Sequence, residues 1–116
     1  MSERSDINRL VDMRAALADI QNLTNVGKEA LRADRVAQQA VAYNLAVLGE
    51  GARAISQGLR DRYPDVPWRD LIAQRNLVVH EYHRIDFENI WTTVTEDIPQ
   101  LDQMLSVIQT TESARS

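Results

Sequence analysis

Cysteine is absent from the 116-residue sequence, which excludes a disulfide scaffold and any zinc site built from thiolates. Glycine and proline are scarce, at four and three residues, and aromatic residues make up only 5% of the chain. The core must therefore be built from alanine, leucine, valine and isoleucine, and this composition predicts an all-α domain. No apolar run approaches the roughly 18 residues that a membrane span needs, and the first ten residues, MSERSDINRL, lack the apolar core of a signal peptide. We expect one soluble, cytoplasmic domain over residues 1–116, with no membrane partner.

Charge is unevenly distributed along the chain. The net charge of −4 argues against a dedicated nucleic-acid binder. Residues 53–84, however, carry six arginines against four acids, whereas residues 85–116 carry six acids and one arginine. Twelve of the thirteen basic residues are arginine, whose planar guanidinium suits phosphate and carboxylate groups. The segment RNLVVHEY, residues 75–82, lies in this one basic segment.

Apolar periodicity predicts four helices, over residues 6–23, 34–62, 67–82 and 86–109. Asp6 and Asp86 are suitable N-caps, and Gly27 suits a left-handed cap after the first helix. Pro99 should kink the last helix or divide it in two. The expected architecture is an antiparallel up-and-down bundle of four to five helices, with a core from about residue 6 to 110 and a frayed tail over residues 111–116.

The helix predicted over residues 34–62 has two faces that look buried. One is an apolar seam with alternating spacings of four and three. The other has small residues where a solvent face would carry lysine and glutamate; its members are Tyr43, Val47, Glu50, Gly51, Ala54 and Gly58. Small residues let another helix approach closely, either within the domain or in a second subunit. We favour a second subunit, because a four-helix domain needs only one seam per helix, and this predicts a homodimer.

The segment RNLVVHEY, residues 75–82, surrounds an apolar run with polar groups. At about 100° per residue, Arg75 falls in the middle of an apolar stripe. The stripe consists of Trp68, Leu71, Ile72, Val78 and Val79. A guanidinium there is costly unless it is paired, and Glu50 is the candidate partner. Asn76 and His80 are four residues apart and share one edge of the helix. We expect residues 77–79 to anchor the helix while Arg75, Asn76, His80 and Tyr82 face a cleft.

Residue types and helical geometry allow two interpretations, and on their own they favour the structural one. In the structural one, Arg75 and Glu50 form an ion pair, His80 bonds a carbonyl at the helix end, and Tyr82 covers the end of the bundle. In the functional one, the same polar groups form a site that the core holds in place. His80 and His83 have no carboxylate pattern nearby and make a poor metal site. We therefore expect no metal and no cofactor.

The motif RNLVVHEY resembles that of the HEPN domain (higher eukaryotes and prokaryotes nucleotide-binding). It is particularly similar to the HepT-type toxins, which are encoded beside a minimal nucleotidyltransferase antitoxin. The segments LGEGARAIS (residues 48–56), RYPDVPW (62–68) and ENIWTTVTEDIPQL (88–101) also resemble that family, in the same order. The likeness covers roughly residues 6–108. Gly51, where the family usually has alanine, is a small departure.

The resemblance implies a homodimeric, metal-independent endoribonuclease whose site lies in the cleft between protomers, with RNA as the substrate. Arg75 and His80 would be the catalytic pair and Asn76 the accompanying polar residue. Glu50, which helical geometry pairs with Arg75, is expected to support it. Tyr82 would be the residue that the cognate minimal nucleotidyltransferase antitoxin adenylylates, which neutralises the toxin. The alternative is a non-catalytic HEPN module that binds nucleotide or holds a nucleotidyltransferase partner, and the acidic net charge favours it.

Overall fold

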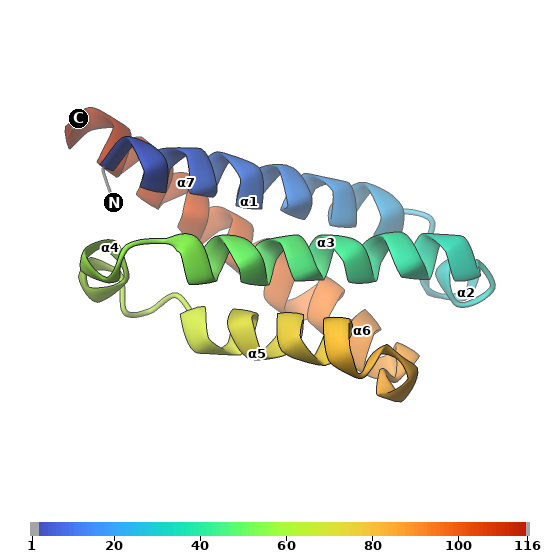
Figure 1. Ribbon diagram of the computed structural model, residues 1–116. Coiled ribbons are helices and arrows are strands. Elements are labelled where there is room, and N and C mark those ends of the chain that lie inside the picture. Colours follow the sequence, from blue (N-terminus) through green and yellow to red (C-terminus); the bar gives the residue numbers. More distant parts are fainter. Residues whose placement is uncertain (1–2, 116) are drawn as a thin grey trace.

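The computed structural model describes residues 3–115, which form helices joined by short loops (Figure 1). In chain order these are α1 (Glu3–Thr24), α2 (Lys28–Arg32), α3 (Arg35–Ala54), α4 (Gln57–Arg62), α5 (Trp68–His80), the 3₁₀ turn η1 (Tyr82–Arg84), α6 (Phe87–Thr92), the π-helix η2 (Thr93–Asp97) and α7 (Ile98–Arg115). No strand occurs within this part of the chain. The predicted all-α bundle is confirmed.

Helix α3 lies at the centre of the bundle. It packs between α1 and α5, and α7 packs against α1 on a further side (Figure 1). Successive long helices run antiparallel, as predicted. The largest fully buried side chains are aliphatic or methionine: Leu10, Met13, Leu17, Ile20, Leu31, Leu45, Leu48, Ile55, Leu59, Ile98 and Leu105. Within residues 3–115 no helix is long and apolar enough to cross a membrane.

The helix predicted over residues 34–62 is wrong, because the chain leaves the helix at Ile55 and Ser56. The Ser56 hydroxyl caps α4 by accepting the Leu59 N–H at 3.3 Å. The Ser56 N–H and hydroxyl also donate to the two carboxylate oxygens of Asp6, at 2.9 and 2.6 Å. Asp6 is only 3% exposed. It lies inside α1 rather than capping it, so its predicted role as an N-cap is also wrong.

The last predicted helix is divided as Pro99 suggested. In η2 the Ile98 N–H bonds the carbonyl of Thr93, five residues earlier, and α7 begins immediately after this π-turn. Pro99 has no N–H to offer the preceding turn, and its ring crowds the carbonyl four residues back, so a local widening of the helix accommodates both. Gly27 has a positive φ, of 95°, but its ψ of 164° lies outside the left-handed helical region, and it is the N-cap of α2. The predicted left-handed cap after the first helix is therefore wrong, although the positive φ still favours glycine.

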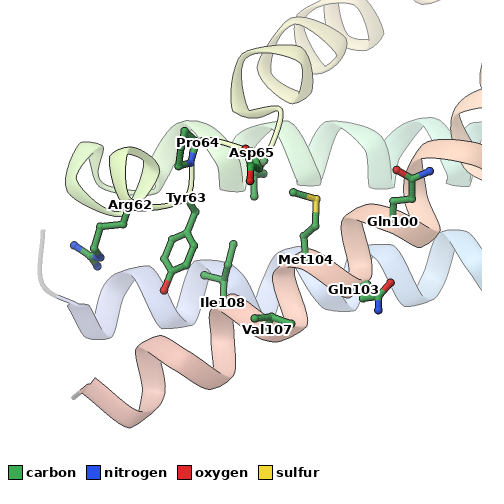
Figure 2. A pocket seen from close by; sticks show the side chains of 10 residues that line it. Arg62, Tyr63, Pro64, Asp65, Gln100, Gln103, Met104, Val107 and Ile108 are labelled. Carbon is green, nitrogen blue, oxygen red and sulfur yellow. The ribbon is translucent and has the colours of Figure 1, made fainter.

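The frayed tail predicted from residue 111 is wrong as far as Arg115; residue 116 lies outside the described residues. Glu112 is 2% exposed and accepts hydrogen bonds from Arg62 Nη2 at 2.5 Å and from the Tyr63 hydroxyl at 2.6 Å. Burial alone would raise the pKa of Glu112, but these hydrogen bonds outweigh it and hold the pKa below its usual value. The contacts fasten the end of α7 to the segment after α4. Figure 2 shows Tyr63 directed toward α7 beside Ile108.

Two glycines of α3 mark where other helices come closest. A Cβ on Gly51 would lie 2.3 Å from Met13 Cγ, so the absence of a side chain there serves the packing of α1. Gly51 is buried within the protomer, and its assignment to a subunit interface is wrong. A Cβ on Gly49 would lie 2.1 Å from Arg75 Cβ, so α5 approaches α3 at the head of the RNLVVHEY segment. Tyr43, by contrast, points outward and is exposed.

Candidate functional site

Helix α5 carries the RNLVVHEY segment and is fixed firmly at its start. Trp68 and Leu71 are buried, and the Trp68 indole N–H donates to the carbonyl of Tyr63 at 3.0 Å. Pro67 precedes the helix as its N-cap, and its ring restricts the φ of that residue. At the other end the Glu81 N–H bonds the carbonyl of Leu77 at 2.9 Å, and the chain then turns into η1. The motif therefore spans the last two turns of α5 and the turn that follows.

Arg75 meets Glu50. Its Nε lies 2.5 Å from Glu50 Oε1, and its Nη1 donates to Asn76 Oδ1 at 3.0 Å. Glu50 also pairs with Arg53, one turn further along α3, at 3.1 Å. The Arg75 side chain is 24% exposed, and its stem packs against Gly49. Two neighbours thus hold the guanidinium, while Nη2 has no acceptor among the described residues.

His80 and Tyr82 lie on the surface near the end of α5. Neither the imidazole nor the phenol hydroxyl has a hydrogen-bond partner within the described part of the chain, so the structural reading of His80 as bonded to a carbonyl is wrong there. The sequence predicts that Tyr82 ends the helix over residues 67–82. In the structure that helix, α5, ends earlier, and Tyr82 belongs to η1. Arg75 and His80 are five residues apart, which corresponds to about 140° around the helix and about 7.5 Å along it. The structure brings together Arg75, Asn76 and Glu50, but His80 projects from another side of α5.

The apolar residues of the motif do not all anchor the helix. Only Val78 packs against the core, whereas Leu77 and Val79 are 42% and 48% exposed. The expected anchoring by residues 77–79 is therefore wrong for two of the three. Helix α3 adds exposed apolar side chains on the side of Glu50, since Val36 and Tyr43 precede it by fourteen and seven residues. We name Val36, Tyr43, Val79 and Tyr82 the motif surface.

Acidic and imidazole side chains do not gather anywhere near the motif in a way that suits a metal. Across the described residues no group of three or more histidines and carboxylates could hold an ion. His83 lies in η1 and is exposed, three residues from His80. The polar groups that the motif does present are a guanidinium, an amide, an imidazole and a phenol. Such a set can bind an anion and move a proton.

Comparison with known protein families identifies the family of this chain. The sequence profile described as ribonuclease HepT-like matches residues 13–108. The chain belongs to the ribonuclease HepT-like family. The family resemblance inferred from the motifs is thereby confirmed. The matched range of this HepT-like chain contains every predicted site residue, from Glu50 to Tyr82.

Several curated proteins are similar to this HepT-like chain over most of its length. A protein of Thermococcus cleftensis named "Probable ribonuclease HepT" is 32% identical over 85% of this chain and 91% of its own. A protein of Methanocaldococcus jannaschii named "Putative RNase" is 28% identical over 93% of this chain and 100% of its own. A third, also named "Putative RNase", comes from Caldanaerobacter subterraneus subsp. tengcongensis and is 26% identical over 77% of this chain and 80% of its own. No solved structure matches the chain.

The sequence did not identify Gly49 as a residue that shapes the site. Gly49 sets the distance between α3 and α5 at Arg75, because any side chain there would meet Arg75 Cβ and the Leu71 carbonyl. The available signal was its position beside Glu50, the predicted partner of Arg75. Because the Glu50 side chain reaches Arg75 on α5, Gly49, the residue before Glu50, lies against the backbone of α5 and has to be small.

Proposed function

We propose that this chain is the toxin ribonuclease of a HEPN and minimal-nucleotidyltransferase toxin–antitoxin pair, acting in the cytoplasm on RNA without a metal. Membership of the HepT-like family and the names of its relatives support ribonuclease activity. The observation that carries the proposal is the partly exposed guanidinium of Arg75, held by Asn76 and Glu50 at the head of a motif whose His80 is open to solvent.

The proposed reaction requires a general base, a general acid and a cation from the protein. The 2′-oxygen of the RNA attacks the adjacent phosphorus, the bond to the 5′-oxygen breaks, and a 2′,3′-cyclic phosphate remains. One group removes the 2′-hydroxyl proton, a second gives a proton to the departing 5′-oxygen, and a cation stabilises the extra negative charge on the phosphorus. An imidazole with an ordinary pKa near neutrality can act as base or acid, and a guanidinium can clamp phosphate oxygens. His80 and Arg75 fit these roles.

A second protomer would supply what one protomer lacks. One imidazole cannot be base and acid in the same turnover, and His80 and Arg75 project from different sides of α5. Two chains related by a two-fold axis would bring two copies of each group to one cleft, so that His80 of one protomer faces Arg75 of the other. The motif surface supports this arrangement, because its exposed apolar side chains lie on the same side of α3 and α5 as the ion pair of Arg75.

The proposed interface has a matched test. Val79→Glu places a charge on the motif surface, and Val107→Glu places the same charge on an exposed valine of α7, away from it. Light scattering should give a dimer for the wild type and for Val107→Glu, and a monomer for Val79→Glu. A dimeric Val79→Glu protein would move the interface elsewhere.

Glu50 would be exchanged for phosphate during the reaction. It occupies the Nε edge of Arg75 in this structure, and a phosphate oxygen is the natural competitor for that edge. Both groups of the pair are partly exposed, so the exchange does not leave a buried charge without a partner. Asn76 keeps its hold on Nη1 and orients the guanidinium throughout.

Tyr82 would be the point at which the antitoxin acts. Its hydroxyl is exposed on η1, immediately after the helix that carries Arg75 and His80. In the proposed step the phenol oxygen attacks the α-phosphorus of ATP, pyrophosphate leaves, and the phenol proton passes to a base of the transferase. The attached adenylate is bulky and anionic, and it would compete with RNA for the same cations. Mass spectrometry after incubation with ATP and the cognate transferase should show one added adenylate, absent in Tyr82→Phe.

The catalytic assignment is tested by two histidine variants three residues apart. Purified wild-type protein and His83→Ala should cut RNA in the presence of EDTA and leave 2′,3′-cyclic phosphate ends, whereas His80→Ala should be inactive. Both histidines are exposed, so neither change should affect folding. Equal cleavage by His80→Ala and the wild type would refute the assignment, and abolition of wild-type cleavage by EDTA would refute metal independence.

A non-catalytic module is the second candidate. The pairing of Arg75 with Glu50 favours it, because the guanidinium is already neutralised in the absence of RNA. This function predicts that the dimer cuts no RNA yet forms a stable complex with the cognate nucleotidyltransferase, and that Glu50→Ala weakens the fold without changing any activity.

A further inference from the structure

Most arginines of the described chain are paired with a carboxylate. The paired set comprises Arg14, Arg32, Arg53, Arg62, Arg75, Arg84 and Arg115. Arg60 and Arg69 have no carboxylate within ion-pair distance among the described residues, yet both line one hollow of about 470 Å³. This hollow lies where α4, the loop with Pro64 and Pro67, and the start of α5 meet. Two guanidinium groups that line one hollow and form no ion pair with its two carboxylates, Asp61 and Asp70, are positioned to bind an anion.

Arg60 gives a second indication. Its Nε is buried and has no hydrogen-bond acceptor within the described part of the chain. A buried N–H without an acceptor is destabilising, so the Arg60 side chain gains a hydrogen bond if it turns toward the hollow and meets an anionic oxygen there. Two carboxylates also line the hollow. Asp61 is occupied by the Gln57 amide at 2.8 Å, and Asp70 also lines a separate hollow on the α7 side of α5.

Arg69, which lines the hollow, lies on the exposed side of the proposed catalytic helix. Arg69, Asn76 and His80 lie within about 40° of one another around α5, at 100° per residue. Arg69 lies about 9 Å along the helix axis from Arg75 and about 16 Å from His80, at 1.5 Å per residue. In the proposed dimer the reacting phosphate lies between His80 of one protomer and Arg75 of the other. An RNA strand held there would pass Arg69 of the protomer that supplies His80, because Arg69 and His80 share one side of α5.

We propose that Arg69 and Arg60 form a second phosphate-binding subsite, which holds the RNA backbone at a distance from the reacting phosphate. This inference rests on the proposed ribonuclease function and names where the rest of the substrate lies. The site reads charge and not sequence, because guanidinium contacts to phosphate carry no base information. It also accounts for the one net-positive segment, residues 53–84, in an acidic protein. Phosphate contacts of this kind make binding strongly dependent on salt.

Binding and cleavage are tested separately. A fluorescent 2′-O-methyl oligouridylate cannot be cleaved, because its attacking oxygen is methylated, so its affinity for the full chain can be measured over a salt series. Arg69→Gln should weaken binding about three- to tenfold and reduce the slope of log affinity against log salt by about 0.7, the value for one phosphate contact on a single strand. Arg60→Gln should change both in the same direction. Asp70→Asn removes a negative charge from the same hollow and should tighten binding.

Arg35→Gln is the matched control. Arg35 is exposed, has no carboxylate partner among the described residues, and begins α3 about 28 Å from the end that adjoins α4, at 1.5 Å per residue. Its loss should leave the affinity unchanged. The subsite is refuted if the wild type does not bind the probe, if Arg69→Gln binds like the wild type, or if Arg35→Gln weakens binding as much as Arg69→Gln.

Cleavage then distinguishes this proposal from the ribonuclease function itself. On an oligoribonucleotide, Arg69→Gln should lower kcat/KM by about the factor by which binding weakens. On a diribonucleotide the loss should be smaller, because that substrate has only the reacting phosphate. If the wild type binds the probe through Arg69 but cuts nothing, the subsite stands and the catalytic proposal fails. If the wild type cuts RNA but Arg69→Gln cuts and binds it equally well, the catalytic proposal stands and the subsite fails.

Discussion

Gly49→Ala should destabilise the protein by forcing α3 and α5 apart. The added Cβ would lie 2.1 Å from Arg75 Cβ and 2.6 Å from the Leu71 carbonyl oxygen, and ordinary contact begins at 3.4 Å. The first contact is therefore short by 3.4 − 2.1 = 1.3 Å. Neither atom is the end of a flexible side chain, so α5 has to move as a unit. Overpacking of this kind costs about 1–3 kcal/mol, and two rigid contacts favour the upper end.

Alanine also has a higher helix propensity than glycine, which offsets about 1 kcal/mol of that cost. The expected net loss is about 2 kcal/mol, or about 8 °C in Tm for a domain of this size. Gly58→Ala is the control, because its Cβ would meet only Arg62 Nη1, at an ordinary 3.8 Å. It should stabilise the protein by about 0.5–1 kcal/mol. Urea unfolding at equal protein concentration measures both, and a Gly49→Ala protein as stable as the wild type would refute this account of the α3–α5 contact.

Three further substitutions each test one side-chain contact, two through stability and one through the KM for RNA. The pKa of Glu112 is lowered in the folded state, so its contacts stabilise the protein above the unfolded-state pKa of about 4.3. That stabilisation is lost as the pH falls through the folded-state pKa. Glu112→Gln should therefore flatten the acid arm of a stability–pH curve, and an unchanged arm would contradict this role of Glu112. Ser56→Ala should cost about 1–3 kcal/mol in urea unfolding, because it removes the α4 cap and leaves one buried Asp6 oxygen without a donor. Glu50→Gln should change Tm little, since exposed pairs contribute about 0–1 kcal/mol, and should lower the KM for RNA by removing a competitor for Arg75; a raised KM would show that Glu50 positions Arg75 for the substrate.

The sequence predicted contacts between residues on neighbouring helices, but not contacts that decide where helices break. The pairing of Arg75 with Glu50 followed from helical periodicity, because each occupied the centre of a face that had to meet another helix. The interruption at Ser56 depends on Asp6, fifty residues away, and the local sequence looks helical throughout. Glu112 is a similar case, since its two hydrogen-bond donors Arg62 and Tyr63 lie about fifty residues earlier. Its nearby ion pair with Arg115 does not indicate that it is buried.

At the candidate site, periodicity identified which residues cluster but not which are exposed. Leu77 and Val79 were expected to be buried because they are apolar, and a hydropathy pattern cannot distinguish a side chain that packs on its own core from one available to a second copy. The predicted helix over residues 67–82 includes Tyr82, and residues 81–86 contain no glycine or proline that would mark an earlier end. The helix nevertheless ends at His80, and the following 3₁₀ turn carries the phenol to the surface. The proposed dimer requires Val79 to be exposed, and the proposed adenylylation requires Tyr82 to be exposed.

The ion pair between Arg75 and Glu50 can have either of two roles: it can hold α3 against α5, or it can keep Arg75 in place to bind RNA. A leucine there would continue the apolar stripe of α5, and replacing a partly buried ion pair by apolar residues is often neutral or stabilising. If the pair exists to bind RNA, then Arg75→Leu combined with Glu50→Leu should keep the free energy of unfolding within about 1 kcal/mol of the wild type and abolish cleavage. If the pair exists to hold α3 against α5, the double variant should unfold much more easily, and Gly49 alone would not account for the approach of the two helices. Urea unfolding and cleavage of one RNA by the same preparation decide between these outcomes, because the two roles predict opposite results in the unfolding experiment.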